Sequence, residues 1–63
     1  MNFKIKEFRE SLDWTQDKLA KKSGVSRTII NGLETGSITI TTTNTLIKIA
    51  NALGKNVSDI FLD

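Results

Sequence analysis

Few side chains of this sequence are able to carry acid–base or covalent chemistry. The 63 residues include no His and no Cys. The commonest general base, the commonest neutral metal ligand and all thiolate chemistry are therefore missing. Only Asp, Glu and Lys remain as acid–base groups, in a chain with room for one small domain. This composition argues against an enzyme, and we expect no cofactor and no metal.

Arg27 is the charged residue whose position most favours a functional role. It directly follows Ser26, at the first position of a predicted helix, where a cation is unfavourable against the helix dipole. A solvated arginine would be slightly unfavourable at that position, so something else must account for it, and we favour a functional role. The net charge of +2, from nine Lys and Arg against seven Asp and Glu, points only weakly to a polyanionic partner.

Three glycines, together with Asp13, divide the sequence into five segments of helical length. Gly24, Gly36 and Gly54 each follow an apolar stripe with helical spacing, as expected of the positive-φ residue after a helix. We expect helices over about 3–12, 15–22, 26–35, 42–53 and 56–61. Helical spacing assigns these side chains to the core: Ile5, Phe8, Leu12, Leu19, Ala20, Val25, Ile30, Leu33, Leu46, Ile49, Ala50, Leu53, Val57, Ile60 and Phe61.

Two adjacent helix starts predict a helix-turn-helix over about residues 15–35. Thr15 and Ser26 are expected N-caps, and Trp14 precedes the first cap at the spacing of a hydrophobic staple with Leu19. Only about three residues, starting at Gly24, separate the two helices. Helices joined so closely meet at a large angle.

Three features within and directly after the second of these helices bear on how it packs. Gly32 is expected to face outward, opposite the apolar stripe, so we expect Gly32→Ala to stabilise the helix. Residues 37–41 alternate polar and apolar, and we interpret them as an extended loop that packs Ile38 and Ile40 onto the core. Glu34 is expected to be structural, with Arg9 as one candidate for an ion-pair partner.

These segments predict one all-α domain of five short helices covering residues 1–63. No apolar run is long enough to span a membrane, and the N-terminal residues do not resemble a signal peptide. We therefore expect a cytoplasmic protein without a membrane partner.

The residues from Thr15 to Arg27, with their Thr-Gln, Leu-Ala and Gly-Val-Ser steps, resemble the lambda-repressor-like helix-turn-helix family, also called the Cro/cI or Xre family. Ile30, Leu33-Glu34 and Gly36 continue the pattern. The resemblance covers nearly the whole chain, to Leu62. It departs from the family at Gly32, where a long base-reading side chain is frequent, in the uncharged loop 37–41, and at Lys55, where an apolar residue is frequent.

The resemblance implies a transcriptional regulator that inserts its third helix into the major groove of double-stranded DNA, usually as a homodimer on a near-palindromic site. Arg27 and Thr28 are then the primary base readers, with Asn31 beside them and Ile29 as a contact to a thymine methyl. The expected contacts to the DNA backbone are Gln16, Ser26, Lys22 and Thr42.

The sequence offers two candidate surfaces for a homodimer. The first is the C-terminal end, where Leu62 joins Phe61 and Val57 with more apolar surface than one short helix buries. The second is the extended stretch around Ile38, through strand pairing across a two-fold axis.

A different class of function stays open. A module of this fold can act on a partner regulatory protein instead of on DNA, and Gly32 and the uncharged loop favour this alternative.

Overall fold

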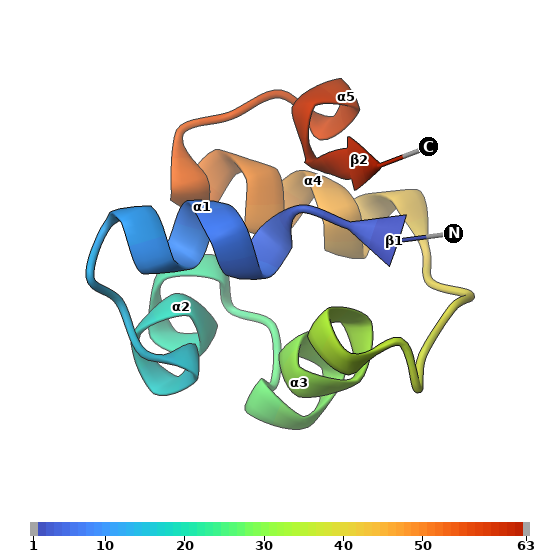
Figure 1. Ribbon diagram of the computed structural model, residues 1–63, viewed down its shortest axis with the longest axis horizontal. Coiled ribbons are helices and arrows are strands. Elements are labelled where there is room, and N and C mark those ends of the chain that lie inside the picture. The colour runs from blue at the N-terminus through green and yellow to red at the C-terminus, as the bar shows by residue number, and fades with distance from the viewer. Residues whose placement is uncertain (1, 63) are drawn as a thin grey trace.

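The computed structural model describes the backbone of residues 2–62 and the side chains of residues 3–60. Its described part is built of helices, and only the two ends of the chain form a short pairing of strands (Figure 1). The predicted all-α class with five helices is confirmed. No helix in the described range has the length and apolarity needed to cross a membrane. The elements are β1 (Asn2–Phe3), α1 (Ile5–Ser11), α2 (Gln16–Ser23), α3 (Arg27–Thr35), α4 (Thr43–Leu53), α5 (Val57–Ile60) and β2 (Phe61–Leu62).

One core unites the five helices, and each helix gives it a completely buried side chain. In chain order these are Ile5, Leu19, Ile30, Ile49 and Ile60, each with no exposed surface. Burying one such side chain contributes about 1.5–3 kcal/mol to folding. In Figure 1, α1 and α4 lie above the pair α2 and α3, so that the helix-turn-helix forms one end of the molecule.

Hydroxyl side chains fix where three helices begin. The Thr15 Oγ1 accepts from the Lys18 N–H at 3.1 Å, and the Ser26 Oγ accepts from the Ile29 N–H at 3.2 Å. Thr42 caps α4 in the same manner. Each cap contributes about 1 kcal/mol to stability. The predicted starts of α2 and α3 are confirmed, and the position of α3 relative to α2 follows from the short turn between them.

The two ends of the chain pair with each other, which the sequence did not predict. β1 and β2 are antiparallel, with Phe3 opposite Phe61, and the Lys4 N–H donates to the Ile60 carbonyl at 2.7 Å. Residues 2–3 are therefore extended, and the first helix begins at Ile5, two residues later than expected.

Leu12 is not part of the core. It follows the last residue of α1 and is 43% exposed, and Asp13 next to it has a φ of 58°. The chain thus leaves the helix before the apolar stripe reaches Leu12. The helical spacing of Leu12 with Ile5 and Phe8 was misleading for this reason.

The predicted surroundings of Gly32 are also wrong. Gly32 is buried beneath the loop that follows α3, and the Ile38 N–H donates to the Gly32 carbonyl at 3.0 Å. A Cβ at position 32 would lie 2.5 Å from the Ile38 Cγ1 and 3.1 Å from its Cβ. The loop folds back over the helix, so the missing side chain makes room for Ile38.

Ile38 and Ile40 do not share one environment. Ile38 is half-buried and packs against the core, as expected, whereas Ile40 is 90% exposed. The expectation that both pack onto the core is therefore correct for Ile38 and wrong for Ile40. After Ile38 has filled the space at Gly32, the loop turns outward toward Thr42.

Candidate nucleic-acid interface

A shallow hollow lies where the start of α2 meets the first turns of α3. Its lining residues are Gln16, Arg27, Thr28 and Asn31. The three from α3 stand at positions i, i+1 and i+4 and are all exposed, so they form one polar face of the helix. The structure thus brings together three of the predicted base readers and one predicted backbone contact.

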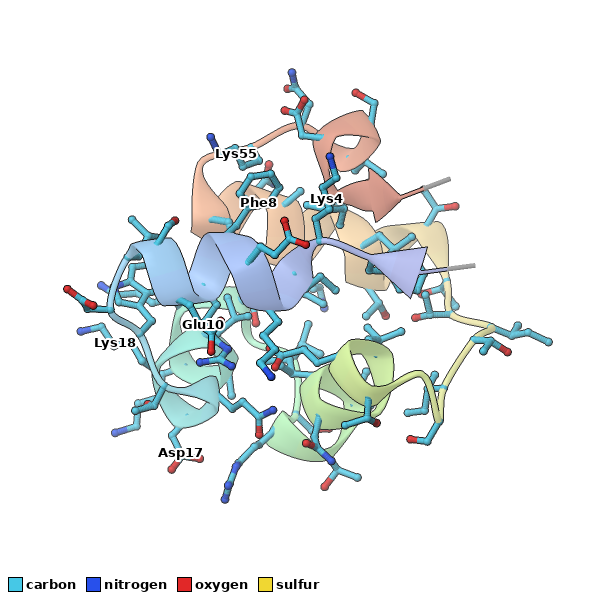
Figure 2. The ribbon with its side chains drawn as sticks, in the orientation of Figure 1. Lys4, Phe8, Glu10, Asp17, Lys18 and Lys55 are labelled. Atoms are coloured by element: carbon cyan, nitrogen blue, oxygen red, sulfur yellow. The ribbon has the colours of Figure 1, made fainter. Side chains whose placement is uncertain are left out.

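Arg27 forms an exposed ion pair at the edge of the hollow. Its Nε lies 3.5 Å from the Asp17 Oδ1, and the two side chains are 63% and 68% exposed. Figure 2 shows Asp17 at the end of α2 that faces away from α1. A pair so exposed contributes only about 0–1 kcal/mol. Arg27 can therefore exchange Asp17 for another acceptor at little cost.

Gln16 connects the hollow to the interior of the domain. Its Nε2 donates to the Asn31 Oδ1 and to the Glu34 Oε1, at 3.1 Å each. The first bond runs between exposed atoms, and the second reaches a carboxylate beneath the hollow. One side chain thus joins a residue of the polar face to a buried group.

That buried group is one half of an ion pair between α1 and α3. The Arg9 Nε and Nη2 donate to the two oxygens of Glu34 at 2.8 and 3.0 Å, and the side chains are 11% and 2% exposed. The Arg9 Nη1 also donates to the Trp14 carbonyl at 2.6 Å. The hydrogen bond to Glu34 raises the pKa of Arg9, so the guanidinium stays charged. The ion pair considered for Glu34 on sequence grounds is confirmed.

The remaining predicted DNA contacts lie outside the hollow. Ile29 is half-buried and packs against the core. Ser26 and Thr42 are exposed, and their hydroxyls cap α3 and α4. Lys22 is exposed in the last turn of α2.

Two contacts of the site were not predicted from the sequence. Asp17 lies ten positions before Arg27, and nothing in the sequence pairs the two. The bond from Gln16 to Glu34 spans 18 positions and depends on the angle between α2 and α3. The Thr-Gln step and the Leu-Glu step of the family pattern are the only sequence signals at these positions.

The end of the molecule away from α3 has a different character. Lys55 lies over the Phe8 ring, with its Nζ 4.9 Å from the centroid, and Figure 2 shows the two beside each other on the far side of α1. Val57, a candidate for the dimer surface, is half-buried against the core. The side chains of Phe61 and Leu62, the other candidates there, lie outside the described residues.

Comparison with known proteins agrees with this geometry. The family model described as Helix-turn-helix matches residues 5–60. A protein of Archaeoglobus fulgidus described as an uncharacterized HTH-type transcriptional regulator is 39% identical over 62 residues, which are 98% of this chain and 86% of that protein. No solved structure matches the chain. The match over all five helices, together with the capped helix pair and its exposed polar face, shows that the chain belongs to the Cro/cI-type helix-turn-helix family.

Proposed function

We propose that this protein is a sequence-specific regulator of transcription that inserts α3 into the major groove of double-stranded DNA. The observation that carries the proposal is the polar face formed by Arg27, Thr28 and Asn31, which borders the start of α2. Guanidinium, hydroxyl and amide groups are those that read base edges in the major groove. The description of the Archaeoglobus fulgidus relative as a transcriptional regulator supports the same function.

Within this proposal, each predicted contact takes a role that its position allows. Arg27 makes a bidentate contact to guanine and releases Asp17 as it does so. Thr28 and Asn31 contact neighbouring base edges, and Ile29 reaches a thymine methyl only at the rim of the face. The resemblance assigns Gln16, Ser26, Lys22 and Thr42 to the phosphate backbone. Because the Gln16 Nε2 donates to Asn31 and Glu34, we assign the phosphate contact of Gln16 to its main-chain N–H and keep the side chains of the other three.

A homodimer completes the proposal. One helix-turn-helix reads too few base pairs to find one site among the competitors in a genome. Two copies related by a two-fold axis would read a near-palindromic site with half-sites about 34 Å apart. The proposed surfaces remain the C-terminal end with Val57, Phe61 and Leu62 and the loop after α3. In that loop Ile38 packs inward, so the 90% exposed Ile40 is the side chain able to contact a second copy.

Salt dependence tests the DNA-binding step. Few Lys and Arg lie near the polar face, so each subunit should neutralise only a few phosphates. We expect a log–log slope of the association constant against salt of about −4 to −7 for a dimer, at about 0.9 per phosphate contact. Electrophoretic shift on random duplex, at low salt and then at rising salt, measures it. Absence of binding at low salt, or binding independent of salt, would contradict the proposal.

One observation favours a second candidate, a module that binds a partner regulatory protein. The loop 37–41 carries no charge, and Ile40 projects from it into solvent. An exposed isoleucine in an uncharged loop suits a protein contact better than a phosphate contact. Failure of the wild type to shift any duplex at low salt, with the domain folded, would favour this candidate. For both candidate functions we propose that the protein is cytoplasmic, because the regulated DNA lies in the cytoplasm.

A further inference from the structure

The hydrogen bonds at the hollow have a direction that limits which bases Asn31 reads. We propose that Glu34 is a positioning residue, which acts through Gln16 to hold Asn31 with its amide nitrogen toward the DNA, so that Asn31 selects guanine over adenine. This inference rests on the proposed function, because it concerns a base contact. It assigns to the buried ion pair of Glu34 a part in specificity in addition to its part in stability.

The orientation of the Gln16 and Asn31 amides depends on Glu34, whose carboxylate is held in one position. Its carboxylate is bound by two N–H groups of Arg9, and only 2% of its side chain is exposed. Arg9 is itself anchored by its bond to the Trp14 carbonyl. An ionised carboxylate only accepts hydrogen bonds. Whatever faces the Glu34 Oε1 from the hollow must therefore be a donor.

Gln16 is the group that faces this oxygen, so its amide has one allowed orientation. The NH₂ must point to Glu34, since the opposite orientation would set the Gln16 carbonyl oxygen against a carboxylate. One N–H of the Nε2 goes to the Glu34 Oε1, and the other goes to Asn31. Both donors of Gln16 are then used inside the protein.

The orientation of the Gln16 amide in turn determines that of the Asn31 amide. Because Gln16 presents an N–H, the Asn31 amide turns its Oδ1 inward to accept at 3.1 Å. Its Nδ2 therefore points away from Gln16, and among the described residues nothing accepts from it. Asn31 is exposed on the polar face of α3. The side chain thus offers the N–H donors of its Nδ2 to the groove, while its oxygen is turned toward Gln16.

This arrangement favours one base. A free asparagine recognises adenine by donating to N7 and accepting from the N6 amino group. An asparagine whose oxygen is turned inward loses the second contact. Guanine presents two acceptors, O6 and N7, and matches two outward N–H donors. One good base contact gives about 1–3 kcal/mol of discrimination, so we expect about a tenfold preference for guanine over adenine at the position that Asn31 reads.

A measurement without DNA tests the network itself. In NMR spectra of the free protein, we expect the Gln16 side-chain NH₂ protons to exchange with solvent several-fold more slowly than those of Asn51. Asn51 is an exposed amide on α4 without a side-chain partner among the described residues. Equal exchange rates of the two amides would show that the Gln16 amide is free, and would overturn the inference whether or not the protein binds DNA.

Selection of bound duplexes from a random pool tests the specificity. Asn31→Ala identifies the base pair that Asn31 reads, as the one where preference is lost. Gln16→Leu keeps the size of the side chain and removes its amide, so the Asn31 amide can rotate. We expect the guanine preference at that base pair to fall from about tenfold to near equality with adenine, while the other positions are unchanged. Asn51→Leu is the matched control and should leave every preference unchanged.

The possible outcomes separate this inference from the proposed function. If the wild type binds no DNA, the proposed function fails and the base preference fails with it, although slow exchange of the Gln16 amide would still establish the network. If the wild type binds and Gln16→Leu weakens all sequences alike, the Gln16 side chain contacts phosphate and does not position Asn31. Adenine preferred by the wild type at the Asn31 position would also overturn the inference.

Discussion

The two sides of α3 are held against the domain by opposite kinds of contact. On one side, Glu34 forms a buried ion pair with Arg9 and receives a hydrogen bond from Gln16. On the other side, Gly32 presents bare backbone, and Ile38 of the following loop packs into the space. The first side is held in place by charge and by directional hydrogen bonds, and the second by the fit of Ile38 against the helix backbone.

Under the proposed function, this difference separates the contacts of α3 that affect DNA reading from those that affect packing alone. The polar contact reaches the exposed face of α3 through Gln16, so changes in it should alter both stability and DNA reading. The apolar contact involves only Gly32 and Ile38, on neither of which the proposed base contacts depend. Changes in it should therefore alter stability first.

Loss of the buried charge should have the largest effect. Glu34→Ala leaves the Arg9 guanidinium, with an 11% exposed side chain, without its carboxylate. Removal of one partner from a buried pair typically costs about 3–5 kcal/mol, a large part of the stability of so small a domain. Urea unfolding measures the loss.

Replacement of both partners is the matched control for that loss. The double variant Arg9→Met with Glu34→Leu removes both charges and keeps apolar volume, so it should recover most of the free energy of unfolding. Stability of Glu34→Ala within about 1 kcal/mol of the wild type would show that the pair is hydrated and not buried.

Crowding on the other side of the helix should have a smaller effect. In Gly32→Ala the new methyl must displace the side chain of Ile38. Overpacking lowers the free energy of unfolding by about 1–3 kcal/mol. The better helix propensity of Ala raises it by about 1 kcal/mol. We therefore expect a net loss of about 1 kcal/mol, or several degrees in the melting temperature, measured by thermal unfolding.

A second substitution shows whether Ile38 causes that loss. In the Ile38→Ala background the methyl at position 32 has space, so Gly32→Ala should there be neutral or stabilising. A stabilising effect of Gly32→Ala in the wild-type background would restore the expectation from sequence that position 32 faces solvent.

The exposed ion pair should have the smallest effect on stability. Asp17→Asn removes the partner of Arg27, but both side chains are more than half exposed. We expect the free energy of unfolding to change by less than about 1 kcal/mol. Binding to all duplexes should become tighter, because a carboxylate near the phosphates is lost. Weaker binding of Asp17→Asn would show that Asp17 holds Arg27 in its reading position.

The helices could be predicted from the sequence because their signals are local. Thr15 and Ser26 cap within three residues, and Gly24 and Gly36 have the positive φ values expected after a helix. Such contacts involve neighbours in the chain, so the sequence alone indicates them. The polar face of α3 was found in the same manner, from helical spacing and the family pattern.

Three contacts between elements, unlike the ion pair of Arg9 and Glu34, could not be predicted. Gly32 looked exposed on a helical wheel, because no local signal shows that the loop folds back and brings Ile38 over it. The strand pairing of the two ends joins residues at opposite ends of the chain, and the bond from Gln16 to Glu34 joins two helices. All three depend on tertiary geometry.

The most direct test of the account is selection of bound duplexes with the wild type and with Arg27→Ala. The account predicts that the wild type enriches a near-palindrome with half-sites about one helical turn apart. Arg27→Ala should lose preference at one base pair in each half-site, worth about 1–3 kcal/mol, and keep the rest. If the wild type enriches no sequence, or if Arg27→Ala weakens all sequences equally, then α3 does not read bases through Arg27 and the central claim is wrong.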